Sequence, residues 1–211
     1  MKVHGVLFDL DGVLVSTDHY HYLAWKRIAD KLDISFTPEM NNALRGVSRM
    51  ESLDRLLGEA SDQFDESQKR ALADEKNAYY RESIGKLTPE AILPGVSDVL
   101  QYFKERKMPM GIGSSSKNAG LILERTGLRG DFEVVIDGTK IDRSKPDPEV
   151  FLKGASGLGL DPAGVLVFED AEEGISAALN AGMIALKVGS PDPRAHLSIA
   201  NMAAFPIING D

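Results

Sequence analysis

Residues able to bind a metal ion and a phosphate follow four short apolar runs of the chain, where each run ends. They are Asp9 and Asp11 after residues 6–8, Ser114 after 110–113, Lys145 beyond 134–136, and Glu169 and Asp170 after 165–168. If the runs are parallel strands, their carboxyl ends meet at one edge of a sheet, where ligands bind. Clustered carboxylates coordinate Mg²⁺ through oxygen, and Mg²⁺ in turn bridges phosphate oxygens. The pattern therefore predicts a phosphate–magnesium site.

The other side chains at these positions fit the same chemistry. The Ser114 hydroxyl can donate to phosphate, and Lys145 can neutralise it as a point charge. An Asp or Ser after one strand is typical of a helix cap, but four such strand ends together favour a site. The sequence has no cysteine and no histidine cluster, which argues against a zinc site and excludes a cysteine nucleophile.

Two rival phosphate-binding motifs are incomplete or absent. Gly111 and Gly113 begin like a dinucleotide-binding fingerprint, but the third glycine and the acidic partner are missing. No G-x-x-x-x-G-K-[ST] sequence is present. A nicotinamide-dependent enzyme and a nucleoside triphosphatase are therefore disfavoured.

Short, nearly all-apolar runs alternate with amphipathic stretches in most of the chain. We expect buried strands at residues 6–8, 110–113, 134–136, 165–168 and 184–188, and helices at 96–103, 117–126, 149–157 and 173–181. This alternation predicts an α/β fold, a doubly wound parallel sheet with helices on both faces. Residues 190–211 give no clear signal.

The segment that follows the first strand breaks this alternation, because it carries helical patterns and no strand. Ala24, Ile28 and Leu32 have the spacing of one helix stripe, and Ser48 with Glu51 matches a capping box. We expect an all-helical cap domain at residues 16–86, inserted into a core domain made of residues 1–15 and 87–211.

The composition limits the partners. Twenty-four Lys and Arg against 32 Asp and Glu give a net charge of −8, with no basic block, so we expect no nucleic-acid or membrane partner. Asp9 and Asp11 interrupt the apolar run that a signal peptide would need, and no stretch is long enough to span a membrane. We expect a cytoplasmic monomer.

These motifs resemble those of the haloacid dehalogenase-like phosphotransferases. The resemblance is carried by residues 8–14, then Ser114, then Lys145 with Pro146, then Glu169 with Asp170, in that order over the whole core. It implies a Rossmann-like core with a helical cap that enters after the first motif, as inferred above. It also implies a Mg²⁺ cofactor, held by Asp9, Glu169, Asp170 and the Asp11 carbonyl.

The cap is similar to that of the sugar phosphomutases within this family. The similarity implies that β-D-glucose 1-phosphate and glucose 6-phosphate are interconverted through a β-glucose 1,6-bisphosphate intermediate. The substrate-binding residues that it implies are Trp25, Gly46, Val47, Ser48, Arg49, Ser52, Lys76, Ser114, Ser115, Ser116, Lys117 and Asn118. Arg49 and Lys76 are expected at the second, non-transferring phosphate or beside His21, and Ser116 and Asn118 complete that distal site.

The catalytic roles follow the resemblance. Asp9 is the expected nucleophile that forms an aspartyl phosphate, with Lys145 neutralising charge. Asp11 is the expected general acid and base, and residues i and i+2 of an extended segment point to the same side. Thr17, His21 and Trp25 lie at i, i+4 and i+8 on one helix face. His21 is expected to orient Asp11, and Trp25 to roof the site.

Three alternatives remain beside the mutase. A magnesium-dependent sugar-phosphate phosphatase shares the first half of the mechanism and differs in that water intercepts the aspartyl phosphate. A non-catalytic binding protein is disfavoured because Asp9, Asp11 and Lys145 are all present. A phosphonatase-like reaction needs a cap lysine that forms a Schiff base, and Lys76 is the one candidate.

Overall fold

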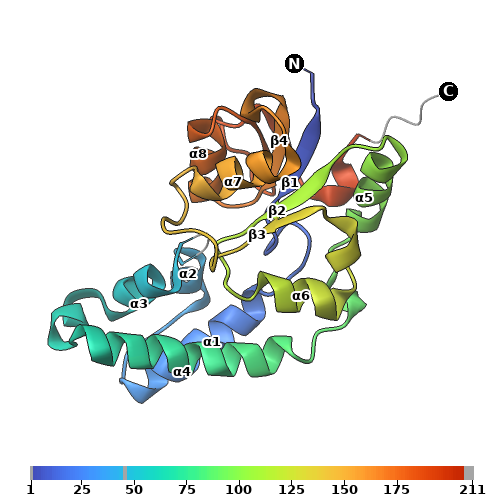
Figure 1. Ribbon diagram of the computed structural model, residues 1–211. Coiled ribbons are helices and arrows are strands. Elements are labelled where there is room, and N and C mark those ends of the chain that lie inside the picture. The colour runs from blue at the N-terminus through green and yellow to red at the C-terminus, as the bar shows by residue number, and fades with distance from the viewer. Residues whose placement is uncertain (1, 45–46, 207–211) are drawn as a thin grey trace.

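The centre of the molecule is a six-stranded sheet in which every neighbouring pair of strands is parallel. The computed structural model describes residues 2–44 and 47–206. The strands are β1 (Gly5–Phe8), β2 (Met110–Gly113), β3 (Val134–Ile136), β4 (Val165–Glu169), β5 (Ile184–Val188) and β6 (Leu197–Ile199), in the order β3-β2-β1-β4-β5-β6 (Figure 1). The five predicted strands are confirmed. The order reverses direction between β1 and β4, which is where ligands bind in such sheets.

Helices cover both faces of the sheet. On one face, α5 (Val96–Glu105) and α6 (Ala119–Thr126) share an apolar core with Phe8; on the other, α7 (Glu149–Leu158) and α8 (Glu172–Asn180) share one with Leu7. Consecutive residues of β1 therefore serve opposite cores, as a strand buried on both faces requires. The predicted Rossmann-like, doubly wound sheet is confirmed.

Between β1 and α5 the described residues form helices and no strand, and four of these helices make up the cap. These are α1 (Asp18–Lys31), α2 (Pro38–Asn42), α3 (Arg49–Leu57) and α4 (Glu66–Ile84), and the long α4 runs beside α1 (Figure 1). The cap has its own apolar core, which includes Trp25, Ile28 and Leu53. Ser48 caps α3 by accepting from the amide of Glu51 at 3.2 Å. The helical cap is confirmed, while the boundaries at residues 15/16 and 86/87 stay a prediction.

The end of α4 ties the cap to the core. Tyr80 and Ile84 belong to the same apolar cluster as β1 and α5. Arg81 donates to the side chain of Asn118, at the start of α6, at 3.0 Å. Both contacts hold the end of α4 against the core domain. Short 3-10 turns complete the fold at Gly58–Gln63, Pro89–Ala91, Arg129–Asp131, Pro162–Gly164 and Met202–Ala204.

The segment that gave no sequence signal adds an edge to the sheet. β6 pairs with β5, and beyond it Met202 and Phe205 pack against the apolar core beneath α5. A three-residue edge strand with Leu197 half exposed carries too short a pattern to be seen in the sequence. No helix in the described part of the chain is both long and apolar enough to cross a membrane.

Candidate active site

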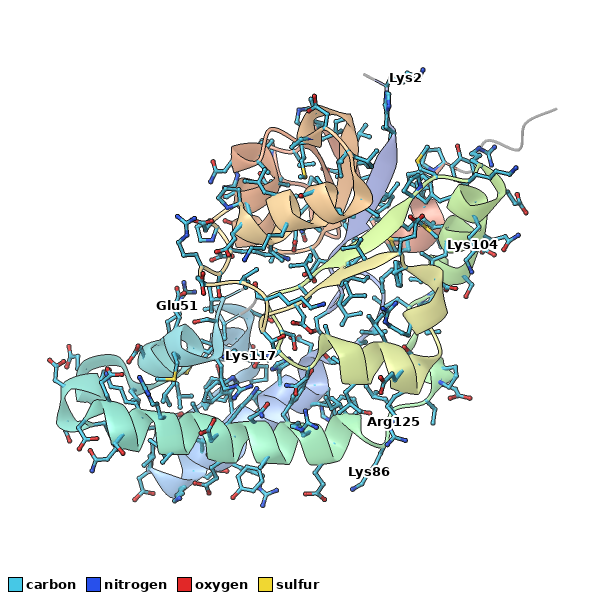
Figure 2. All side chains as sticks on the ribbon, in the orientation of Figure 1. Lys2, Glu51, Lys86, Lys104, Lys117 and Arg125 are labelled. Carbon is cyan, nitrogen blue, oxygen red and sulfur yellow. The ribbon has the colours of Figure 1, made fainter. Side chains whose placement is uncertain are left out.

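A cavity of about 470 Å³ lies between the strand ends and the cap. The predicted residues on its wall are Asp9, Asp11, His21, Trp25, Val47, Ser48, Arg49, Ser52, Lys76, Ser114, Ser115, Ser116, Lys117, Asn118, Lys145, Glu169 and Asp170. Lys117 lies between the sheet and α4 (Figure 2). Thr17 lies behind the wall, and Gly46 is outside the described residues. The cavity therefore brings together residues from four strand ends and three cap helices.

Lys145 joins the ends of β1 and β4 at the floor of the cavity. Its Nζ donates to Asp9 Oδ1 at 2.5 Å and to Glu169 Oε2 at 2.7 Å, and all three side chains are nearly inaccessible. Burial raises the pKa of Asp9 to about 6, and Lys145 acts in the opposite direction. Burial also disfavours the ammonium of Lys145, but the charges of Asp9 and Glu169 outweigh this and raise its pKa.

Three carboxylates at this floor form a group able to hold a metal ion. One oxygen each from Asp9, Glu169 and Asp170 lies within 4.8 Å of the others. All the donors are carboxylate oxygens, the type that Mg²⁺ prefers. Asp11 does not join this group through its side chain, and the predicted role of its carbonyl stays a prediction. The donor set therefore fits a hard divalent cation.

The turn after β1 needs glycine for two reasons. Gly12 has φ +86°, a conformation that side chains with a Cβ rarely adopt. A Cβ there would also lie 2.2 Å from Asp170 Oδ2, so the Asp170 carboxylate packs directly on the Gly12 backbone. The turn is closed by the Gly12 amide, which donates to the Val15 carbonyl at 2.8 Å. It brings Asp11 toward the metal-binding group.

Asp11 is held by Thr17 rather than by His21. The Thr17 hydroxyl donates to Asp11 Oδ1 and accepts from the Tyr80 hydroxyl at 3.2 Å. Burial, together with the charges of Asp9 and Asp18, raises the pKa of Asp11 to about 8. The Asp11 carboxyl therefore carries a proton at neutral pH and can donate it, as a general acid must.

His21 instead contacts Lys76 from α4. The Nζ of Lys76 lies 2.9 Å from His21 Nδ1, and the His21 ring packs on Tyr80 with 4.1 Å between centroids. The ammonium also lies over the rings of Trp25 and Tyr80. Burial and the charge of Arg49 lower the pKa of Lys76 to about 7, and burial holds that of His21 well below its ordinary value.

The wall of the cavity also carries cations and amides. Arg49 begins α3 and lies 3.6 Å from Asp74, with about a fifth of its side chain exposed. Asn118 donates to Asn77 Oδ1 at 2.9 Å and accepts from Arg81, so two residues of α4 fix its amide. Arg49, Lys117 and Asn118 thus line the cavity as groups that can donate hydrogen bonds to a bound anion.

The loop after β2 supplies hydroxyls to the wall of the cavity. Ser114 and Ser116 bond to the backbone within the loop, which fixes its shape. Ser115 Oγ is buried and is the one side-chain polar atom of the described residues that is both buried and without a hydrogen-bond partner. Such a hydroxyl costs free energy unless a ligand satisfies it, which favours a polar ligand here.

Sequence reasoning missed the residues of α4 that support the site. Tyr80 links Thr17 to His21, and Arg81 with Asn77 orients Asn118. Asp18 and Asn41 also line the cavity and went unnoticed. The signal for Asn77, Tyr80 and Arg81 was their position within five residues of Lys76 on the same helix.

Comparison with known proteins agrees with this geometry. The chain is 45% identical over 191 residues to the β-phosphoglucomutase of Bacillus subtilis (strain 168), covering 90% of this chain and 84% of that protein. It is 32% identical over 184 residues to a fructose-1-phosphate phosphatase of Escherichia coli (strain K12), covering 87% and 95%. A crystal structure of β-phosphoglucomutase from Clostridium difficile matches with a TM-score of 0.92 at 38% identity, over 96% of this chain and 93% of that one.

A family model extends the match over the core and the cap together. The model of the haloacid dehalogenase-like hydrolases matches residues 3–182, which include every predicted site residue. The match confirms the resemblance inferred from the four motifs. The chain belongs to the haloacid dehalogenase-like hydrolase family.

Proposed function

We propose that this chain is a β-phosphoglucomutase, which interconverts β-D-glucose 1-phosphate and D-glucose 6-phosphate through β-glucose 1,6-bisphosphate. One observation carries the proposal: a single cavity is lined both by a carboxylate–lysine group and by cap cations with a fixed amide. A sugar that carries two phosphates could bind the carboxylate–lysine group with one phosphate and the cap cations with the other. The 45% identity to a β-phosphoglucomutase supports this choice of substrate.

In the first step Asp9 is the nucleophile and β-glucose 1,6-bisphosphate is the donor, so that the sugar that leaves still carries one phosphate. A carboxylate oxygen of Asp9 bonds to phosphorus while the bond from phosphorus to the leaving sugar oxygen breaks. The proton held on Asp11 passes to that oxygen, so the sugar leaves as a neutral hydroxyl. Lys145, which already bonds Asp9, balances the charge that gathers on the transferring group.

The cofactor that fits the acidic group is Mg²⁺, which Asp9, Glu169 and Asp170 would hold, with the Asp11 carbonyl as a further expected ligand. When bound, the ion neutralises charge on the phosphoryl oxygens and orients them for in-line transfer. Glu169 also accepts from the amides of Asp170 and Ala171, at 3.0 and 2.9 Å, so the protein backbone fixes this ligand before any metal binds.

In the second step the phosphoryl group returns to the sugar. A hydroxyl of the bound sugar phosphate bonds to phosphorus, the bond from phosphorus to Asp9 breaks, and Asp11 takes the hydroxyl proton. The sugar must present either end to Asp9, with its other phosphate at Arg49 and Asn118. The cap over the floor excludes water, which would otherwise hydrolyse the aspartyl phosphate.

A sugar-phosphate phosphatase is the second candidate. The family match is to hydrolases, and the relative in Escherichia coli is a fructose-1-phosphate phosphatase. The floor of the cavity serves both reactions equally, because they share the attack by Asp9. The cations of the cap favour the mutase over a phosphatase of sugar monophosphates, since such a phosphatase has no second phosphate to hold. A cytoplasmic location and a monomeric state complete the proposal.

Phosphoenzyme formation tests the part that both candidates share. The unmodified chain, incubated with Mg²⁺ and a sugar phosphate or a small phosphoryl donor, should gain one phosphoryl group that acid-quench mass spectrometry places on Asp9. Asp9→Asn should show neither the phosphoenzyme nor turnover. Full activity in Asp9→Asn would remove the nucleophile from the proposal.

A further inference from the structure

A buried lysine lies beside the loop that carries Asp170, away from the cavity floor. Lys187 is the fourth residue of β5, is 7% exposed and is the register partner of Glu169 in the pairing of β4 with β5. Its Nζ donates to the carbonyl oxygens of Asp170, at 2.5 Å, and Val188, at 2.8 Å. None of the ion pairs formed within residues 2–44 and 47–206 includes it.

The peptide unit that follows Asp170 is held at both of its polar atoms. Its carbonyl accepts from Lys187, and its N–H, which belongs to Ala171, donates to Glu169 Oε1 at 2.9 Å. The preceding N–H, of Asp170 itself, donates to the same Glu169 oxygen at 3.0 Å. The backbone on both sides of Asp170 is therefore fixed, and with it the direction in which its carboxylate leaves the chain.

The charge of Lys187 and its hydrogen bond to the Asp170 carbonyl have opposite effects on the binding of a divalent cation. By charge alone, removing an ammonium near the acidic group strengthens cation binding, because like charges repel. By position, removing it frees the Asp170 carbonyl and lets the carboxylate turn away from Asp9 and Glu169, which weakens binding. The sign of the change in metal affinity therefore separates the two roles.

We propose that Lys187 is a positioning residue, which holds the backbone of Asp170 in the conformation that Mg²⁺ binding requires. The inference rests on the proposed function, because it takes Asp170 as a magnesium ligand. Lys187 touches neither the cavity nor the reacting groups described above. It acts through one hydrogen bond to the Asp170 carbonyl.

The test is the affinity for Mg²⁺ alone, without substrate. The variant Lys187→Met keeps most of the apolar stem and loses the donor. Its control is Lys140→Met, which removes another lysine that donates to a backbone carbonyl, that of Val135 at 2.5 Å. The dissociation constant is obtained from the rise in melting temperature with Mg²⁺ concentration, and kcat is measured separately at saturating Mg²⁺.

We expect Lys187→Met to bind Mg²⁺ about tenfold more weakly, with kcat largely restored at saturating Mg²⁺ and the control unchanged. Lys187→Arg, which keeps a donor, should recover most of the affinity. If Lys187→Met does not fold, Lys187→Gln, too short to reach the carbonyl, is expected to show the same loss. Unchanged or tighter binding in the folded Met or Gln variant would overturn the role of Lys187. No effect of Mg²⁺ on the unmodified chain would instead overturn the proposed magnesium site, and this inference with it.

Discussion

The Nζ of Lys76 lies 2.9 Å from Nδ1 of His21, across the interface between α4 and α1. The His21 ring is held in its neutral form, because burial keeps its pKa well below its ordinary value, so its Nδ1 is able to accept from a protonated Lys76. His21 is thereby committed to Lys76, and Asp11 is left to Thr17. Tyr80 joins the two pairs, since its ring packs on His21 and its hydroxyl donates to Thr17.

The Tyr80 hydroxyl is therefore expected to matter for turnover. Tyr80→Phe keeps the ring against His21 and removes the bond to Thr17, so Thr17 orients Asp11 less firmly. A neutral hydrogen bond of about 1 kcal/mol corresponds to a roughly fivefold fall in kcat, with KM little changed.

The neighbouring Tyr79 provides the control. Its hydroxyl donates to Glu75 at 2.8 Å on the outside of the cap, so Tyr79→Phe should leave kcat unchanged. Steady-state kinetics of the two variants give the two kcat values to be compared. Equal kcat values for both variants would show that Tyr80 only fills space.

The raised pKa of Asp11 predicts a pH dependence of stability in the absence of metal. The pKa is about 8 in the folded chain against 3.8 for an ordinary aspartate, chiefly because of burial. Between these values the folded chain holds a proton that the unfolded chain has released. The stabilisation from Asp11 is thus complete below the lower value and is lost as pH rises through the upper one.

Asp11→Asn supplies the reference for this measurement, because its amide does not titrate. We expect the free energy of unfolding of the unmodified chain, measured with urea and without Mg²⁺, to fall relative to that of Asp11→Asn as pH rises from about 4 to about 8. Parallel curves for the two proteins would mean that Asp11 is ionised throughout this range.

Arg49 is expected to bind the phosphate that is not being transferred. Arg49→Ala should raise KM for sugar phosphates by about tenfold to a hundredfold, since a hydrogen bond to a charged group contributes about 1.5–3 kcal/mol. Hydrolysis of a small phosphoryl donor should be unchanged, because such a donor has no second phosphate for Arg49 to bind.

A second cap arginine serves as the control for charge. Arg27 stacks on Tyr79 at 3.5 Å and does not line the cavity, so Arg27→Ala should leave both activities unchanged. If Arg49→Ala reduces hydrolysis of the small donor as strongly as it reduces use of sugar phosphates, Arg49 is structural or binds the transferring phosphate.

The strands of the core and the site residues at their ends could be predicted from the sequence, because each is marked by a local pattern. Each strand is a short apolar run. Asp9 and Ser114 follow their strands directly and Glu169 ends its strand, so the edge they share could be inferred from topology. The contact between Tyr80 and Thr17 spans 63 residues and depends on how α4 crosses α1. No local pattern encodes such a crossing. Lys76 was expected beside His21 or at a phosphate, but the sequence did not show that Thr17, rather than His21, bonds Asp11.

At the edge of the sheet, too, the sequence predicts local elements but not the contacts between distant ones. The alternation of strand and helix predicts β5, but β6 has three residues, of which the first two are exposed. Its pairing is decided by the edge that β5 leaves open. Lys187 was overlooked for a related reason, because a lysine within an apolar strand gives no indication of which carbonyl it contacts.

The most direct test of the central claim is incubation of the chain with β-D-glucose 1-phosphate, Mg²⁺ and a trace of β-glucose 1,6-bisphosphate. Glucose 6-phosphate and free phosphate are measured in the same reaction. The proposed function predicts that glucose 6-phosphate accumulates with little release of phosphate. Release of free phosphate with no glucose 6-phosphate would contradict it, and would show that water, not the sugar, takes the phosphoryl group from Asp9.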